Sequence, residues 1–211
     1  MDTITENDLS RKEKIVNATL EIMKKEGIDG VTIRKIASRA EVNVALINYH
    51  FGSKENLINE ALKILVGDLR YSFSILEDSN LSSREKLQSF LVKYFSVAIR
   101  YPDIIRNILL KGSVSSKSQI EFLQFLKTSG LGKIQDILRD LTGNSNPIEL
   151  TSIMFQIIGA VAFPLLIFPV INTVAQLDAT LVGSLDDYIS KLLDNYFGKY
   201  NKINKEVYYG N

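Results

Sequence analysis

Apolar residues recur along most of the chain at intervals of three and four positions, which is the spacing of one face of an α-helix. In the stretch 10–26, Ile15, Ile22 and Met23 share such a face, and Gly27 follows two lysines as a helix-ending signal. No run alternates apolar and polar residues between hairpin turns, so no strand is predicted. The pattern therefore predicts an all-α protein.

Short polar breaks separate the helical runs and set their expected boundaries. Asn146 followed by Pro147, for example, is a strong helix-start signal. We expect helices at about 10–26, 32–40, 44–51, 53–69, 83–100, 103–110, 119–141, 147–171 and 181–197. A polar tail from Gly198 is expected to fray. We divide the chain into a three-helix domain, residues 1–52, and a larger helical domain, residues 53–211, joined by the helix that starts near residue 53.

One helix is apolar enough to raise the question of a membrane. The stretch 153–171 is almost entirely apolar and reaches the length of a bilayer-spanning helix. Pro164 and Pro169 interrupt its last third, and no Lys/Arg cluster flanks it. We therefore expect no membrane contact. Instead we expect a helix that is bent near Pro164 and buried on most sides, in a core or in a subunit interface.

Composition narrows the possible chemistry. The chain of 211 residues has no cysteine and a single histidine, His50, which excludes disulfides, cysteine nucleophiles and most metal sites. No phosphate-binding glycine loop or hydrolase motif occurs, so we expect neither an enzyme nor a cofactor.

The polar N-terminus lacks a signal peptide, and we expect a cytoplasmic protein. Residues 10–54 hold nine Lys and Arg against five acidic residues, although the whole chain carries only +1. This asymmetry is expected if one end of the chain meets phosphates.

The segment 32–57 has the pattern of a helix-turn-helix, in which two short helices meet at a steep angle across a tight turn. Ile36 and Ala37 fall on the inner face of the first helix, and Ala37 is small where the second helix must approach closely. Val42 lies in the turn, and Ile47 anchors the second helix from the other side. The second helix then has an outer face that is free to enter the major groove of DNA.

The residue types on this outer face suit contacts with DNA. Asn48 suits a bidentate pair with adenine, and Val44 and Ala45 suit contact with a thymine methyl. The candidate DNA-binding residues are Thr32, Arg34, Asn43, Val44, Ala45, Asn48, Tyr49, His50 and Lys54. Of these, Thr32, Tyr49, His50 and Lys54 are expected to contact phosphates, which fix the register of the protein on the duplex.

Residues 32–57, TIRKIASRAEVNVALINYHFGSKENL, resemble the DNA-binding signature of the TetR family of bacterial regulators. The match runs from about Lys12 to Leu62 and is carried by Gly30-Val31-Thr32, Ile36-Ala37 and the run from Tyr49 to Glu55. The resemblance implies a homodimer, a palindromic double-stranded operator and a small-molecule effector bound in the C-terminal domain. It implies a repressor that the effector releases by shifting the fourth helix. The identities of effector, pocket residues and operator stay open.

The sequence departs from the family pattern at Glu41, where the family usually has glycine in the turn. Glycine tolerates a left-handed backbone, which costs another residue about 1 kcal/mol. His50 is either a phosphate contact, which we favour, or part of the packing of its helix. Arg34, Lys35 and Arg39 are either phosphate contacts or a solvated helix face. The alternative to a transcriptional regulator is a similar DNA-binding protein with another role, such as chromosome organisation.

Overall fold

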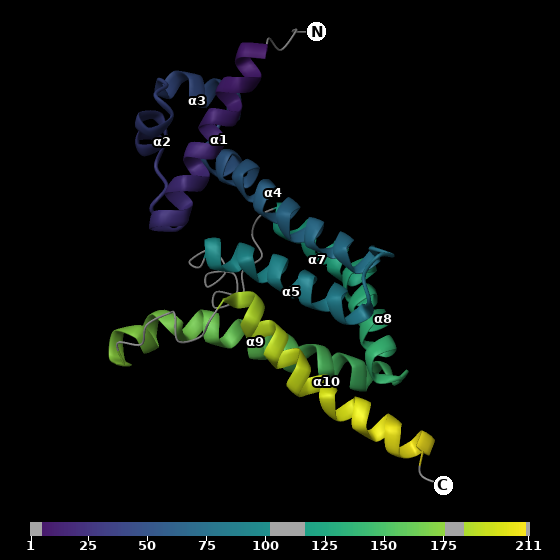
Figure 1. The fold of residues 1–211 in the computed structure, drawn as a ribbon. Coiled ribbons are helices and arrows are strands. Elements are labelled where there is room, and N and C mark those ends of the chain that lie inside the picture. The colour runs from purple at the N-terminus through teal and green to yellow at the C-terminus, as the bar shows by residue number, and fades with distance from the viewer. Residues whose placement is uncertain (1–5, 102–116, 176–183, 210–211) are drawn as a thin grey trace. The chain divides into compact units, whose positions relative to one another are not determined.

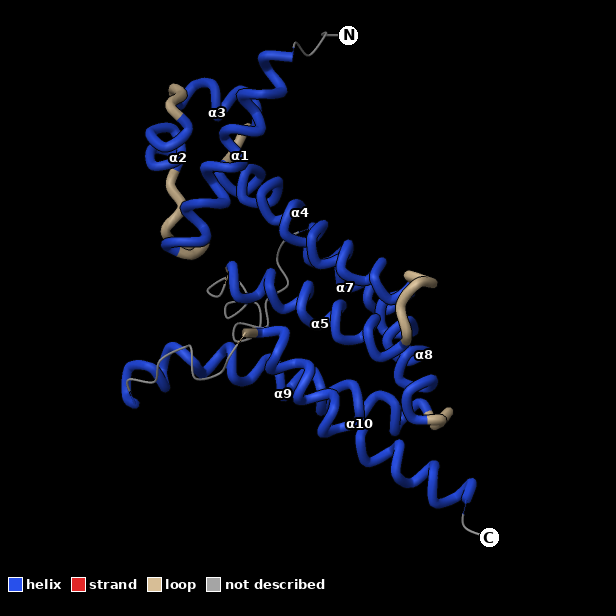
Figure 2. Tube along the Cα trace, viewed as in Figure 1, coloured by secondary structure: helices blue, strands red, loops and turns tan. Residues whose placement is uncertain are grey.

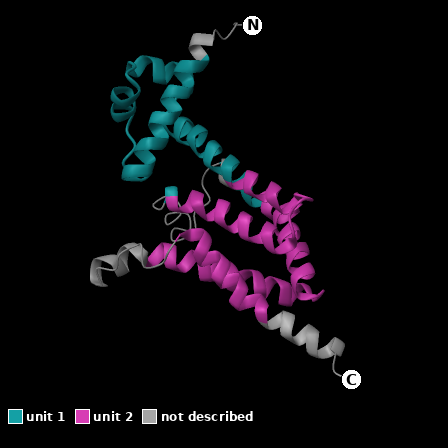
Figure 3. Ribbon diagram, in the orientation of Figure 1, with its two compact units in different colours: residues 1–68, 100–123 teal, residues 69–99, 124–211 magenta. Residues whose placement is uncertain are grey.

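The computed structural model describes residues 6–101, 117–175 and 184–209, and within them every regular element is a helix (Figures 1 and 2). The all-α prediction is therefore confirmed. The expected helix 103–110 lies outside the described residues. The chain divides into two compact units, residues 1–68 with 100–123, and residues 69–99 with 124–211 (Figure 3). Because helix α4 contributes residues to both units, it links them, while a domain boundary at residue 52 stays a prediction.

The first unit contains the predicted three-helix arrangement. Its described helices are α1 (Glu6–Glu26), α2 (Ile33–Ala40), α3 (Val44–Phe51), the first part of α4 (Lys54–Ser72) and the first part of α7 (Lys117–Phe125). Helix α1 packs on α2, and α2 on α3. The apolar residues that the sequence assigns to the inner faces are buried, and Ile15, Ile36, Ile47 and Leu57 have no exposed surface. The hydrophobic pattern thus fixes which face of α3 is left outside.

The described part of the second unit is helical. Its elements are the 3₁₀ helix η1 (Phe73–Glu77), α5 (Ser83–Arg100), the end of α7 (Lys117–Phe125), the π turn η2 (Leu126–Gly130), α8 (Leu131–Thr142), α9 (Pro147–Ala175) and α10 (Leu185–Tyr209). Helix α8 packs on η1, α9 and α10, and α9 packs on α10. The expected starts at Ser83 and Pro147 are confirmed.

Two expected helices differ from the structure. The single helix expected over 119–141 is instead α7, the π turn η2 and α8, and it starts at Lys117. The π turn ends at Gly130, where an added Cβ would lie only 3.1 Å from the Phe73 ring. Close packing against that ring therefore favours glycine, since a larger residue would have to displace the ring by a few tenths of an ångström. The last helix starts at Leu185 rather than 181 and continues to Tyr209, so the expected fraying from Gly198 is not observed in the backbone.

Helix α9 is less buried by its own chain than the sequence led us to expect. Among the described residues, Pro147–Ile167 is long and apolar enough to cross a membrane, with only 28% of this window buried. Ile148, Phe155 and Phe163 are 80%, 66% and 62% exposed. Inside the unit, α9 still contributes Ile153, Ile157 and Val161 to the core. The helix therefore has one buried face and one exposed apolar face.

Candidate DNA-binding interface

Capping residues fix the N-terminal ends of α2 and α3. Thr32 is the N-cap of α2, and its hydroxyl oxygen accepts a bond from the Lys35 N–H at 3.3 Å. Asn43 is the N-cap of α3, and its Oδ1 accepts from the Leu46 N–H at 2.7 Å. Each cap satisfies a free N–H of the first helical turn. Thr32 keeps its hydroxyl proton, and Asn43 its amide N–H₂, as donors for DNA.

The turn itself passes through Glu41 in a left-handed conformation, with φ 53° and ψ 46°. Among the described residues, no other non-glycine residue has a positive φ. The Glu41 and Val42 N–H groups donate to carbonyls at the end of α2, including that of Ala37. The Glu41 carboxylate accepts from Lys14 Nζ in α1 at 3.2 Å. The expected left-handed backbone is confirmed, and Lys14 places a positive charge beside the Glu41 carboxylate.

Helix α3 buries one side and exposes the side predicted to read DNA. Ile47 and Phe51 are buried in the first unit. Tyr49 is 79% exposed and Val44 40% exposed, and Ala45 and Asn48 are exposed as well. An exposed face that combines an aromatic ring, an amide and small apolar groups is suited to base edges in the major groove.

His50 takes part in packing more than the sequence suggested. It is half-buried, with its ring edge-on to Tyr49 and Phe51 at centroid distances of 5.2 and 6.2 Å. Its Nε2 is shielded from solvent and has no hydrogen-bond partner among the described residues. A phosphate contact therefore stays a prediction for Nδ1, because Nε2 faces inward.

The basic residues of α2 divide into two groups. Lys35 forms an ion pair with Glu26 and donates to the Gly30 carbonyl at 3.2 Å, and Arg39 Nε donates to Glu21 at 2.6 Å. The hydrogen bond from Arg39 and its charge hold the pKa of Glu21 below its usual value.

Arg34 on the same helix is exposed, and no ion pair involves it within the described part of the chain. Of the three cations, Arg34 is therefore the one that stays free to meet a phosphate.

Two further basic residues, Lys54 and Lys12, lie near α3. Lys54, at the start of α4, is half-buried, and its Nζ donates to the Val31 carbonyl at 3.4 Å. Lys12 of α1, which the sequence analysis did not select, places its Nζ 5.8 Å from the centre of the Phe51 ring. Its position depends on how α1 packs, so only the folded chain reveals it beside α3.

The second unit contains a small apolar hollow where an effector was expected. It has about 10 Å³ of free space, roughly one water site. Its walls come from α5, α8 and α9 and consist of Leu87, Phe90, Leu91, Ile134, Leu138, Met154, Ile157 and Ile158. The lining offers no polar group to orient a ligand. A drug-sized effector needs several hundred Å³, so binding here requires the helices to separate.

Together, a capped α2, a tight turn and an exposed α3 face define a helix-turn-helix DNA-binding module. The family model described as "Bacterial regulatory proteins, tetR family" matches residues 15–61, which span this module. Over this module the chain is similar to the TetR family of bacterial regulatory proteins.

Curated relatives match over part of the chain. The chain is 36% identical over 59 residues to HTH-type transcriptional regulator BetI 1 of Chromohalobacter salexigens, covering 28% of this chain and 29% of the relative. It is 28% identical over 109 residues to the regulator BetI of Rhizobium meliloti, covering 52% and 54%. The chain thus spans about a third to a half of the length of these relatives.

Solved structures match over nearly the whole chain. A TetR transcriptional regulator from Legionella pneumophila has a TM-score of 0.61 at 20% identity, with 91% of this chain and 99% of that chain covered. A tetR-family regulator from Streptomyces coelicolor also has a TM-score of 0.61, at 17% identity, with 98% and 85% covered. At these identities the likeness shows the fold and not the ligand.

Proposed function

We propose that this chain is a sequence-specific, cytoplasmic DNA-binding transcriptional regulator, a repressor that a small molecule releases from its operator. The observation that carries the proposal is the outer face of α3, where Tyr49 is 79% exposed while Ile47, two positions earlier, is fully buried. A helix that is anchored on one side and exposes such a face on the other is suited to binding DNA. The basic groups around it suit a phosphate backbone.

The candidate residues take different parts in this reading. Asn48, Val44 and Ala45 contact base edges, and Tyr49 contacts a phosphate through its hydroxyl. Arg34 and Thr32 contact phosphates at the start of α2, where the helix N-terminus also favours negative charge. Base contacts set the sequence preference, whereas phosphate contacts set the register and the salt dependence.

The exposed apolar face of α9 supports a homodimer. Ile148, Phe155 and Phe163 recur at spacings of seven and eight, which places them along one side of the helix. An apolar stripe of this kind is typical of a subunit interface. We propose that a second copy of the chain, and not a lipid bilayer, packs against this stripe, because exposed polar residues such as Ser152 and Gln156 interrupt it. A two-fold dimer then reads a palindromic operator.

Helix α4 is the proposed route for release by an effector. It extends from Lys54, next to the DNA-binding module, to Ser72 in the second unit. A ligand that separates the helices around the apolar hollow would shift α4 and so change the distance between the two α3 helices of a dimer. Half-sites lie about 34 Å apart, one helical turn of DNA. A small change in spacing therefore weakens binding to both half-sites together.

Selection of binding sites from a random duplex DNA pool tests the proposal. Purified wild type is compared with Asn48→Ala/Tyr49→Ala, and with the matched control Asn17→Ala/Tyr71→Ala, which removes an exposed asparagine and an exposed tyrosine from α1 and α4. We expect wild type and control to enrich one palindrome and the α3 double mutant to enrich none.

Other outcomes of the selection would count against the proposal. If all three proteins enrich the same palindrome, α3 does not carry recognition. Enrichment of only degenerate, dispersed sequences would favour a role such as chromosome organisation. Unfolding and refolding before the selection removes any bound effector, so a protein that still enriches nothing at low salt would refute DNA recognition.

A further inference from the structure

A tyrosine hydroxyl from α10 fills a gap in the hydrogen bonding of α9. In an α-helix each carbonyl accepts from the N–H four residues later. For Ala160 that residue is Pro164, which has no N–H, so this carbonyl lacks its usual partner. Tyr188 Oη donates to the Ala160 carbonyl at 2.7 Å. The bond that proline removes from one helix is therefore supplied by another.

The apolar surroundings of the Ala160 carbonyl make the hydrogen bond from Tyr188 stabilising. Ala160 lies between two core residues, Ile157 and Val161, which are only 2% and 1% exposed. The carbonyl is thus next to the apolar core, where an unsatisfied acceptor is costly. On α10, Ile189 and Leu193 are fully buried and hold Tyr188 against α9.

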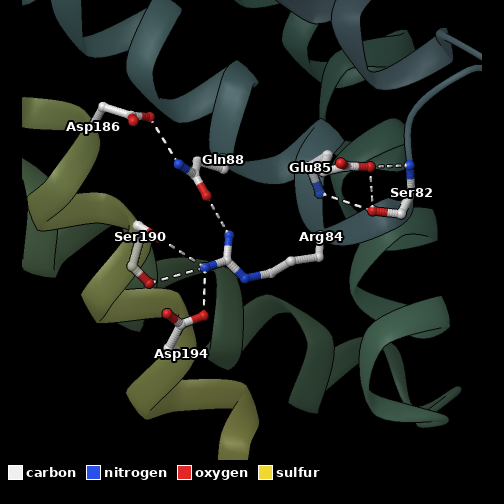
Figure 4. Close-up of polar contacts among 7 residues, drawn as sticks. All are labelled: Ser82, Arg84, Glu85, Gln88, Asp186, Ser190 and Asp194. Carbon is white, nitrogen blue, oxygen red and sulfur yellow. Dashed lines mark hydrogen bonds and ion pairs between the residues drawn. The ribbon is translucent and has the colours of Figure 1, made fainter.

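Further polar contacts fix the position of α10. Tyr196 Oη donates to Gln156 Oε1 on α9 at 2.7 Å. From α5, Arg84 donates to the Ser190 carbonyl at 2.9 Å and to Asp194 at 2.6 Å (Figure 4). Gln88, which accepts from Arg84, donates to Asp186 at 2.8 Å. Figure 4 shows Arg84 and Gln88 facing Asp186, Ser190 and Asp194 of α10. The helix that carries Tyr188 is therefore held from α5 as well as from α9.

We propose that Pro164 and Tyr188 form a latch between α9 and α10. When α10 is docked, the Tyr188 hydroxyl supplies the hydrogen bond that α9 lacks at Pro164. When α10 is released, α9 is free to bend at Pro164. Prolines inside helices are the usual sites of sharp kinks. The latch makes the conformation of α9 depend on whether α10 is in place. It rests on contacts within one chain and does not depend on the proposed DNA binding.

A double-mutant cycle in the full-length protein tests the latch. Tyr188→Phe removes the hydroxyl and should lower Tm by about 2–6 °C, as expected for loss of a hydrogen bond to a partly buried acceptor. Pro164→Ala restores an N–H to position 164, so the Ala160 carbonyl regains a partner within α9. In that background we expect Tyr188→Phe to lower Tm by less than about 1 °C.

Two controls separate the latch from a general loss of packing. Pro169→Ala removes a second proline from the interior of α9 and should leave the full cost of Tyr188→Phe unchanged. Tyr196→Phe, which removes a hydroxyl bound to a side chain, should cost the same with and without Pro164.

Hydrogen–deuterium exchange gives a second readout. Peptides from α9 around Pro164 should exchange faster in Tyr188→Phe and return to the wild-type rate in the double mutant with Pro164→Ala. If the effects of Tyr188→Phe and Pro164→Ala simply add in Tm, and exchange in α9 does not respond, the latch is refuted.

Discussion

Replacing Arg34 with alanine tests which basic residues of α2 meet the DNA backbone. Arg34 is exposed and free of ion pairs among the described residues, whereas Arg39 is bound to Glu21 at 2.6 Å. Each lost phosphate contact lowers the slope of log K against log salt by about 0.9. A dimer carries two copies of Arg34, so Arg34→Ala should lower the slope by about 1.8. Arg39→Ala should change it by much less, because Arg39 is already neutralised.

Fluorescence anisotropy of a labelled duplex with the selected palindrome measures these slopes. Between 50 and 200 mM salt, a slope difference of about 1.8 changes the ratio of wild-type to Arg34→Ala affinity about 12-fold, with the larger defect at low salt. Arg34→Lys keeps the charge and should keep most of the slope. An unchanged slope in Arg34→Ala together with a fall of about 2 in Arg39→Ala would refute the argument, since the Glu21 ion pair must then break on DNA.

Other predictions address the turn, the dimer and the core. Glu41→Gly relieves the left-handed backbone, worth about 1 kcal/mol, and should raise Tm by roughly 2–4 °C, whereas Glu41→Ala should not. Phe155→Glu should give a monomer in sedimentation velocity, whereas Ile64→Glu, at an exposed apolar position of α4, should leave the dimer intact; a dimeric Phe155→Glu would contradict the proposed interface. Burial raises the pKa of Tyr94 to about 12, so its contribution to stability is complete below about pH 10 and falls as the pH rises toward 12, by at most about 1.4 kcal/mol per pH unit. Urea denaturation between pH 9 and 12 tests this, because the range includes the ordinary tyrosine pKa of about 10. The free energy of unfolding should fall less steeply with pH in Tyr94→Phe than in wild type. Equal falls in the two proteins would exclude Tyr94 as the origin.

Local sequence signals predicted much of the DNA-binding module. Thr32 and Asn43 are cap residues by type and position, and the turn geometry required a left-handed residue at Glu41. These features depend on a few neighbouring residues, which a sequence displays directly. The outer face of α3 followed because Ile47 and Phe51 account for its inner face.

Features that depend on contacts between distant residues were not predictable in this way. The pairing of Arg39 with Glu21 joins residues 18 positions apart, and it decides which cation is free for DNA. The inward-facing Nε2 of His50 likewise depends on packing.

The differences in the second unit have the same origin. The π turn ends at Gly130, which packs against the ring of Phe73, a residue far away in the sequence. The extension of α10 to Tyr209 contradicts a tail composition that suggested fraying.

The bond between Tyr188 and Ala160 also has a consequence for the order of events during synthesis. The two residues are 28 positions apart, and Tyr188 is made second. At about 5–20 residues per second, the ribosome needs roughly 1–6 s to reach it. Until then the carbonyl at the proline has only water or transient partners. This hydrogen bond of α9 therefore forms only after translation has delivered Tyr188, and a chain truncated before Tyr188 would lack it.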